Sequence, residues 1–440
     1  MSATTVGQPE ADPDFGSGDA SGGSPGVGLA PREHLAAWKA LLDKPLLSYY
    51  LVMGITALLL ALGLVMVLST SSASALASGD PPYQDFQRQL LGVAIGLPVM
   101  WFTARSSPRV FRALAYPLLV ISIVGLMLTL VPGVGVTSGG ASRWIALGPF
   151  DLQPSELAKF AFVLWGADLL ARKEKLRQLT EWRHLLLPLL PGAGVICLLV
   201  MMGDDLGTTF VLLTIFLTLL LVIGTPGRLF ACVLGLMAVV MLMLIVVAPY
   251  RLERLTSFMN PATNPLGVNM QPIQGKWALG SGGWFGVGLG ASRQKWGWVP
   301  NDTTDYIFAI IGEELGLIGT LCVSALYGVL AYAGLRIARR VDDTFMALAA
   351  AGVTAWIVVE AIVNIGAVID VFPITGVPLP LVSYGVSSLL ATMAALGMLM
   401  SFAKREPGAR EVLAARGDTG VRRVLSWLGL TPDASRRHRE

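Results

Sequence analysis

Long apolar runs, each bounded by a short polar stretch, follow one another along most of the chain. A helix needs about 20 residues to cross the ~30 Å hydrocarbon core of a membrane. Because backbone polar groups in lipid must be satisfied within the segment, each run of this length is predicted to be a helix. Ten such runs occur, at 48–70, 88–104, 111–132, 155–171, 185–202, 206–224, 228–248, 305–335, 345–369 and 383–402. The pattern therefore predicts an all-α polytopic membrane protein with ten transmembrane helices.

The positions of the basic residues give this predicted bundle an orientation. If the N-terminus lies in the cytoplasm, 24 of the 32 Lys and Arg residues fall in loops, helix ends and tails on the cytoplasmic side. The positive-inside rule expects this bias, and an odd number of spans would break it. We therefore predict that both termini are cytoplasmic and that 249–304 forms a large extracytoplasmic loop between the seventh and eighth helices. The loop at 133–154 is predicted to lie on the same outer side.

The two ends of the chain differ in composition from its apolar middle. Residues 1–30 are rich in Gly, Ser, Pro and Ala and have little to bury, which is typical of a disordered tail. They also lack the pattern of a cleaved signal peptide. We divide the chain into a disordered cytoplasmic tail at 1–47, a transmembrane domain at 48–402 and a basic cytoplasmic tail at 403–440.

Composition narrows the possible chemistry. Hydrophobic residues make up 54% of the chain and charged residues 14%, with a mean hydropathy of +0.65, as in membrane proteins. The three Cys lie in apolar runs, where we interpret them as small core residues, and the three His lie in the tails and a short basic loop. This placement argues against a disulfide framework, a His metal site and a Ser-His-Asp triad. Acid–base chemistry must then rest on carboxylates.

The glycine-rich run GSGGWFGVGLG at 280–290 resembles a phosphate-binding loop in composition only. It lacks the strand-to-helix setting of a dinucleotide site, so neither a nucleotide nor a nucleic acid is predicted as a ligand. We interpret it as a packed loop in which glycine allows the close approach of a bulky ligand. The following SRQKWGW places Arg293 and Lys295 between aromatic residues, a surface that suits pyrophosphate and sugar rings.

Polar residues at the predicted outer ends of the helices form further candidate sites. Glu156 and Lys159 lie at i,i+3 on one helix face, where they form either a local ion pair or a substrate contact. Asp204 and Asp205 occupy a tight turn, either as a helix cap or to orient a neighbouring cation. Arg143 lies in the outer loop just before the helix that carries Glu156.

Asp305 stands at the junction of the large outer loop and the eighth predicted helix. It is either a catalytic base, whose pKa partial desolvation would raise, or a structural N-cap. Carboxylates at a membrane boundary are costly, and Glu313 and Glu314, two turns deeper, are predicted to bind neighbouring helices or to support Asp305. The segment 364–390 has three prolines and two glycines between 373 and 385, which predicts a rigid turn that walls the same outer cavity.

Five motifs, in the same order, resemble the SEDS family of proteins (shape, elongation, division and sporulation). They are QPSELAK, DLGTT, GSGGWFGVGLG, DYIFAIIGEELG and the segment 364–390. The resemblance covers about residues 48–402, and SRQKWGWVP is similar to the cell-division members of the family. The chain departs from the family at two points. Asp204 stands where many members have Pro, and the stretch Asp302-Thr303-Thr304 replaces one in which many have His.

The resemblance implies a peptidoglycan glycosyltransferase that polymerises lipid II, an undecaprenyl-pyrophosphate-linked disaccharide-pentapeptide. It would act on the outer face of the cytoplasmic membrane at the division septum, with Asp305 as the family's essential aspartate. Supporting or substrate-binding candidates are Arg143, Glu156, Lys159, Asp205, Gln274, Lys276, Arg293, Lys295 and Ser383. Implied partners are a class B penicillin-binding transpeptidase and other membrane proteins of the division complex. No cofactor is required; a divalent cation could assist, but no motif specifies a metal ligand.

Two other functions stay open on the sequence alone. A polar cavity in a multi-helix membrane protein also suits a flippase for the lipid-linked precursor, although no inverted repeat supports it. A noncatalytic scaffold that activates the transpeptidase is the other alternative. A scaffold would tolerate Asp305→Asn and a glycosyltransferase would not, which makes Asp305 the residue that discriminates between them.

Overall fold

The structure is a computed structural model that describes residues 44–78, 83–138, 141–147, 150–176, 182–260, 267, 269–409 and 411–412 of the 440-residue chain. Most of the two tails predicted at 1–47 and 403–440 lies outside the described residues. Their predicted disorder and cytoplasmic location therefore stay predictions. The account that follows concerns the described part of the chain.

Each of the ten apolar segments coincides with a helix. In chain order these helices are α2 (Leu47–Ser78), α3 (Gln84–Arg105), α4 (Pro108–Thr129), α5 (Pro154–Lys175), α6 (Trp182–Met202), α7 (Leu206–Val222), α8 (Gly227–Val247), α11 (Ile307–Arg340), α12 (Thr344–Val368) and α13 (Val386–Ala403). Within the described residues, six of them are long and apolar enough to cross a membrane, namely α2, α4, α8, α11, α12 and α13. The chain is therefore a mostly helical, multi-pass membrane protein.

The two long loops predicted from the sequence contain secondary structure of their own. The loop at 133–154 folds into a three-stranded antiparallel sheet in the order β1 (Gly135–Ser138), β2 (Ala141–Leu147) and β3 (Phe150–Leu152), so the all-α prediction missed a small sheet. The loop at 249–304 contains α9 (Pro249–Met259) and α10 (Met270–Gly282). All five elements are too short for a membrane span, so a search for long apolar runs does not find them.

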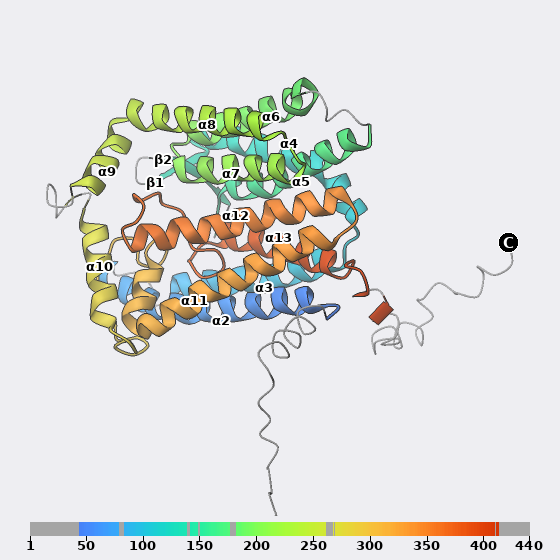
Figure 1. Ribbon diagram of the computed structural model, residues 1–440. Helices are drawn as coiled ribbons and strands as arrows, with labels where there is room; N and C mark the ends of the chain where they lie inside the picture. Colours follow the sequence, from blue (N-terminus) through green and yellow to red (C-terminus); the bar gives the residue numbers. More distant parts are fainter. Residues whose placement is uncertain are drawn as a thin grey trace, which may run out of the picture. The chain divides into compact units, whose positions relative to one another are not determined.

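Helices α12 and α13 pack at the centre of the bundle. α13 packs against α3, and α12 packs against α11, α7 and α5. Trp356 of α12 and Phe402 of α13 are completely buried. In Figure 1 the long helices lie side by side along one direction, and α9 and α10 run across their ends on the left of the view, near β1 and β2. This end of the bundle carries the polar residues singled out above.

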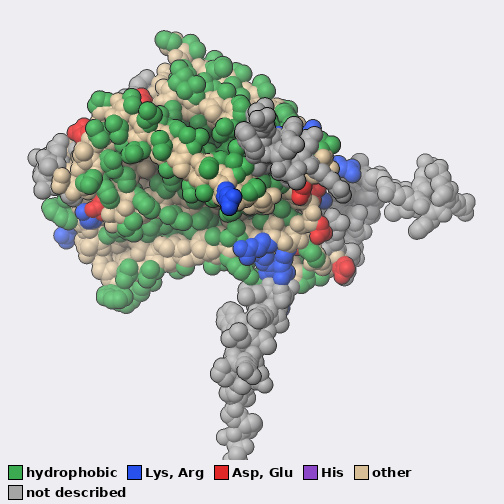
Figure 2. All heavy atoms as spheres, turned by 45° about the horizontal axis from the view of Figure 1, so that its top comes forward, with side chains coloured by type: hydrophobic (Ala, Val, Ile, Leu, Met, Phe, Trp, Pro, Cys, Tyr) green, Lys and Arg blue, Asp and Glu red, His purple; other side chains and the backbone are tan. Residues whose placement is uncertain are grey.

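The outer surface of the bundle is apolar. Figure 2 shows hydrophobic side chains over broad areas of the molecule, and α8 buries only Val233 and Met237. A bundle in lipid needs such a surface, because lipid tails are as apolar as the side chains that face them. Because lipid is itself apolar, a cysteine in an apolar run can face it, and the prediction that all three cysteines lie in the core was wrong for two of them. Cys232 and Cys322, interpreted as core residues, are exposed on their helices, and Cys197 is half-buried.

A kink divides α11 close to its start. Gly316 has φ 71° and ψ −167°, which is not helical. The segment 283–288 enters this break: Leu317 N donates to Gly283 O (2.9 Å), and Val287 N donates to Glu313 O (2.9 Å). A Cβ atom on Gly316 would collide with the backbone of Trp284 and Gly286, so only glycine fits at this close approach. The glycine-rich run is thus packed against the first turns of α11.

Candidate active site

A cavity of about 470 Å³ opens at the end of the bundle where α9 and the small sheet lie. Its walls come from the starts of α3, α5 and α7, from α9, α12 and β2, and from the loop segments around 301–305 and 375–388. The charged residues that line it are Arg88, Arg143, Asp151, Glu156, Asp205, Arg254, Asp305 and Glu360. The cavity therefore brings together four residues singled out from the sequence, namely Arg143, Glu156, Asp205 and Asp305.

The backbone around Asp305 is fixed by Asn364 of α12 and by the proline-rich segment that follows this helix. Asn364 Nδ2 donates to both Asp305 O and Val377 O, each at 2.8 Å. Ser383 Oγ donates to Thr304 O (2.6 Å) and accepts from Leu379 N (2.7 Å). The predicted rigid turn thus walls the cavity and also holds the catalytic candidate. Ser383 acts here through backbone groups.

The side chain of Asp305 has no capping role. The N-cap of α11 is Tyr306, which makes no side-chain cap hydrogen bond. Burial of the Asp305 carboxyl raises its pKa to about 6, while Arg143 and Arg254 counteract the rise and Asp205 adds to it. Such a carboxylate is mostly ionised at neutral pH, yet it is more basic than an ordinary aspartate. The chemistry fits a general base that faces a cavity.

Arg143 and Asp205 are held next to one another. Arg143 Nη2 donates to Asp204 O (2.5 Å), and Arg143 Nη1 lies 4.0 Å from Asp205 Oδ1. Asp205 also caps α7, because Oδ1 accepts from Thr208 N (3.0 Å) and Oδ2 from the Thr208 hydroxyl (2.7 Å). The two alternatives for Asp205 are thus both present: it caps a helix and lies beside a cation.

Lys159 is enclosed by two carboxylates rather than exposed to the cavity. Its ammonium donates to Glu156 Oε1 (2.7 Å) and to Glu360 Oε1, and only 1% of the lysine side chain is exposed. The second oxygens of Glu156 and Glu360 have no hydrogen-bond partner in the described structure, and both residues line the cavity. Sequence reasoning missed Glu360. Its signal was a lone carboxylate in the apolar run 345–369.

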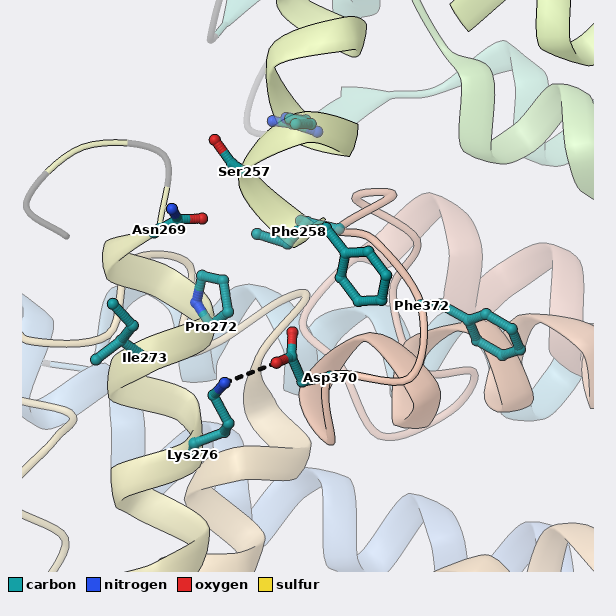
Figure 3. Close-up of a pocket in the computed structure, with 10 residues that line it drawn as sticks. Ser257, Phe258, Asn269, Pro272, Ile273, Lys276, Asp370 and Phe372 are labelled. Carbon is teal, nitrogen blue, oxygen red and sulfur yellow. Dashed lines mark hydrogen bonds and ion pairs between the residues drawn. The ribbon is translucent and has the colours of Figure 1, made fainter. Parts of the chain in front are cut away.

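The remaining basic candidates lie outside the cavity wall. Lys276 of α10 forms an ion pair with Asp370 (2.6 Å) in a neighbouring small pocket, as Figure 3 shows. Lys295 is 3% exposed, and its ammonium binds Glu314 Oε1 (3.1 Å) and Gly290 O (2.7 Å). Arg293 is exposed, and its backbone N–H donates to Glu313.

Gln274 of α10 is half-buried and does not line the cavity either. Among the described residues, no group of three or more His, Cys, Asp and Glu side chains is placed to hold a metal ion. Glu156 and Glu360 pair with Lys159, and Arg143 lies beside Asp205, so the site is a mixed-charge polar cavity that includes Asp305.

Comparisons with known proteins agree with this picture. A family model described as cell cycle protein, for FtsW, RodA and SpoVE, matches residues 49–407. A Mycobacterium tuberculosis protein named "Probable peptidoglycan glycosyltransferase FtsW" is 41% identical over 395 residues, which is 90% of this chain and 74% of that protein. Stage V sporulation protein E of Bacillus subtilis is 38% identical, over 80% of this chain and 96% of its own length.

Solved structures show the same fold. One, from a study of the "structural coordination of polymerization and crosslinking by a peptidoglycan synthase complex", matches with a TM-score of 0.64 and 29% identity, over 80% of this chain and 96% of that one. The rod shape determining protein RodA of Thermus thermophilus matches with a TM-score of 0.59 and 28% identity, over 80% and 96% of the two chains. The chain therefore belongs to the SEDS family of cell cycle proteins, the family of FtsW, RodA and SpoVE.

Proposed function

We propose that this protein is a peptidoglycan glycosyltransferase that polymerises lipid II into β-1,4-linked glycan strands. The observation that carries the proposal is the Asp305 carboxyl, which lines a polar cavity beside arginines in a chain that belongs to this family. Relatives named as peptidoglycan glycosyltransferases cover most of the chain.

The reaction joins two lipid-linked sugars. The 4-hydroxyl oxygen of the acceptor N-acetylglucosamine attacks C1 of the donor N-acetylmuramic acid, and Asp305 takes the hydroxyl proton as the new C–O bond forms. The bond from C1 to the pyrophosphate oxygen breaks, and undecaprenyl pyrophosphate leaves with the electron pair. A single displacement inverts the α-linked donor to a β-linked product, so one base suffices.

The pyrophosphate is a good leaving group, and its growing charge needs a fixed cation rather than a proton. Arg143 suits this role, because Asp204 O and Gly203 O hold its guanidinium at the cavity wall. Lys159, Lys276 and Lys295 each already bind a carboxylate, which leaves them less able to meet a new anion.

The proposed setting is the outer face of the cytoplasmic membrane at the division septum. Ten spans with both termini in the cytoplasm would place the cavity on that face, where a class B penicillin-binding transpeptidase would crosslink the product. A cysteine introduced at Thr256 of α9 should then react with an impermeant maleimide from outside intact cells. A cysteine at Asp342, between α11 and α12, should react only after permeabilisation; the reverse pattern would contradict this orientation.

The activity is tested by glycan synthesis from purified lipid II, with the cognate transpeptidase present and its crosslinking blocked. Wild type should make long glycan and Asp305→Asn should make none. Asp302→Asn is the matched control, because Asp302 is a buried aspartate of the same turn that does not line the cavity. Equal polymer from wild type and Asp305→Asn would refute the base. A folded wild-type complex that makes no polymer but moves lipid II across vesicles would be a flippase; one that only activates the transpeptidase would be a scaffold.

A further inference from the structure

We propose that the loop 283–289, between α10 and α11, is a membrane anchor that inserts Trp284 and Phe285 into the lipid bilayer. We call this segment the anchor loop. Its partner is a lipid surface, namely the zone where headgroups meet acyl chains at the end of the bundle that carries the cavity. The inference goes beyond the proposed reaction and does not depend on it.

Two helices that pack together, α2 and α11, mark the level of the membrane edge. α2 is mostly apolar from Leu47 to Leu68 and then continues as the polar run STSSAS. Beyond its kink, α11 is mostly apolar from Leu317 to Leu335. At the rise of an α-helix these stretches are about 33 Å and about 29 Å long, which matches the ~30 Å hydrocarbon core. Leu68 and Leu317 therefore lie at one edge of the membrane.

Hydrogen bonds hold the anchor loop at this edge. Ile318 N, directly after Leu317, donates to Trp284 O (3.3 Å). The Ser69 hydroxyl of α2 donates to Glu314 Oε1 (2.6 Å), so the end of the apolar part of α2 lies at the same level as the kink in α11. In Figure 1 the loop lies at the lower end of α10, where α11 begins its long run along the bundle.

The side chains of the anchor loop are apolar and exposed. The run GSGGWFGVGLG at 280–290 contains no charged residue. Trp284 is 69% exposed and Phe285 is 82% exposed, and the exposed Leu317, Ile318 and Leu321 of α11 continue this apolar surface along a membrane-spanning helix. Lipid covers such a helix face, and tryptophan is enriched where headgroups meet acyl chains. The position and the composition of the loop therefore both fit lipid as its partner.

The backbone of the anchor loop is prepared for an apolar environment. Irregular backbone is tolerated at membrane depth only where its polar groups are bonded to protein or water. Val287 N donates to Glu313 O (2.9 Å), and Gly288 N donates to Glu314 O (3.1 Å). In an unbroken helix these two carbonyls would accept from the amides four residues later, and those amides donate to the loop instead. Loop and helix thus satisfy one another where they meet lipid.

The test measures the depth of a fluorescent NBD probe in full-length protein reconstituted into phospholipid vesicles. In a variant whose three native cysteines are replaced by alanine, Phe285→Cys carries the probe. Thr256→Cys of α9 is the matched control, because it is also exposed in the segment between α8 and α11. Lipids with a nitroxide near the top of the acyl chain should quench the probe at 285 and not the probe at 256. Iodide on both sides of the membrane should quench the probe at 285 roughly threefold less, because an interfacial group lies about 5–10 Å below the surface.

A second label position keeps both aromatic residues in place. A probe on Leu289→Cys, in the same loop, should also be quenched by the nitroxide lipids. Adding Trp284→Ser and Phe285→Ser should remove most of that quenching and raise iodide quenching roughly threefold, because the loop loses its apolar contact with lipid. Thermal unfolding should match that of the parent, since both side chains are mostly exposed. Met259→Ser is the control, because Met259 is 72% exposed on α9, outside the loop.

Three results would overturn the anchor. Iodide quenching as strong at 285 as at 256, without quenching by lipid, would place the loop in water. Protection of the probe at 285 from both quenchers would mean that protein covers this surface. Adding the transpeptidase should leave the quenching by lipid unchanged; its loss would assign the surface to that partner. None of these measurements depends on glycan synthesis, so the anchor and the proposed function fail separately.

Discussion

The first turns of α11 and the turn just before it contain carboxylates of two kinds. Glu313 accepts hydrogen bonds from the Ser292 hydroxyl, Arg293 N (3.0 Å) and Gln294 N (3.3 Å). Glu314 accepts from the Ser69 hydroxyl (2.6 Å) and from Lys295 Nζ (3.1 Å). Asp305 lies in the turn before the helix, and its carboxyl forms no ion pair or hydrogen bond with another described residue.

The difference lies in what the acceptor oxygens bind. The glutamates use theirs to hold the loop 290–295 against the bundle, so they contribute to the fold. The Asp305 carboxyl leaves its oxygens open to the cavity, because only its backbone is held by described residues. Burial is thus a poor guide to function here, while the presence or absence of partners separates the two kinds of carboxylate.

Asp305→Asn should give the largest effect on activity. Loss of a general base lowers rates by roughly 10²–10⁴-fold, so glycan synthesis should become undetectable or nearly so. The fold should not suffer. The folded-state pKa of about 6 lies above the usual value of 3.8, so the native state binds more protons and this carboxyl costs stability as pH rises through that range. Thermal unfolding at neutral pH should therefore be no lower than in wild type; a clear drop would mean that Asp305 has a structural role.

Glu314→Ala should act mainly on stability. It leaves the buried Lys295 ammonium without its carboxylate, which costs roughly 3–5 kcal/mol in comparable sites. The melting temperature of the purified protein should fall, while activity per folded molecule stays near wild type. The double variant Glu314→Leu with Lys295→Met is the control and should recover most of the loss. A stable Glu314→Ala protein without activity would place this glutamate with Asp305 instead.

The pH dependence of wild type should report on Asp305. A base must be unprotonated, and burial raises the pKa of Asp305 to about 6. The value of kcat/KM should therefore be level above this pH and fall roughly tenfold per unit below it. Initial rates measured from pH 5 to 8 at low lipid II concentration would show this. A profile that stays level down to pH 5 would mean that another group accepts the proton.

Ser383→Ala should give the smallest effect. It removes the hydroxyl that joins Thr304 O to Leu379 N, at a cost of about 1 kcal/mol. Because the turn that carries Asp305 would loosen, kcat should drop several-fold with little change in KM. Ser324→Ala is the matched control, since that hydroxyl donates only to Thr320 O within its own helix. Equal kcat in both variants would show that the clamp is not needed for catalysis.

The sequence predicted the helices well because lipid imposes one solution on a long apolar run. Every predicted span coincides with a helix, from α2 to α13. The small sheet and α9 were missed because short polar elements have no such constraint. Their positions depend on contacts such as Arg251 with Asp204, which lie far apart in the chain.

Part of the candidate site could also be predicted from the sequence. Arg143, Asp205 and Asp305 line one cavity, as their shared predicted position at one end of the helices indicated. Lys276 and Lys295 do not line it, because the sequence predicts at which end of the bundle a loop lies but not the direction of a side chain within the folded loop. Arg254, which also lines the cavity, was not singled out, because an arginine in a polar loop has no local signal; its place depends on α9, which Arg251 holds against Asp204.

The contact between the glycine loop and the kink in α11 has an evolutionary consequence. A Cβ atom on Gly286 would collide with the backbone of Glu314, and one on Gly316 would collide with the backbone of Gly286. Both residues also have positive φ angles, 80° and 71°. Since backbone meets backbone, no substitution at one position can compensate for a change at the other. We expect both glycines to be invariant among descendants of this sequence, so that covariation between positions, which reveals most contacts, would give no sign of this one.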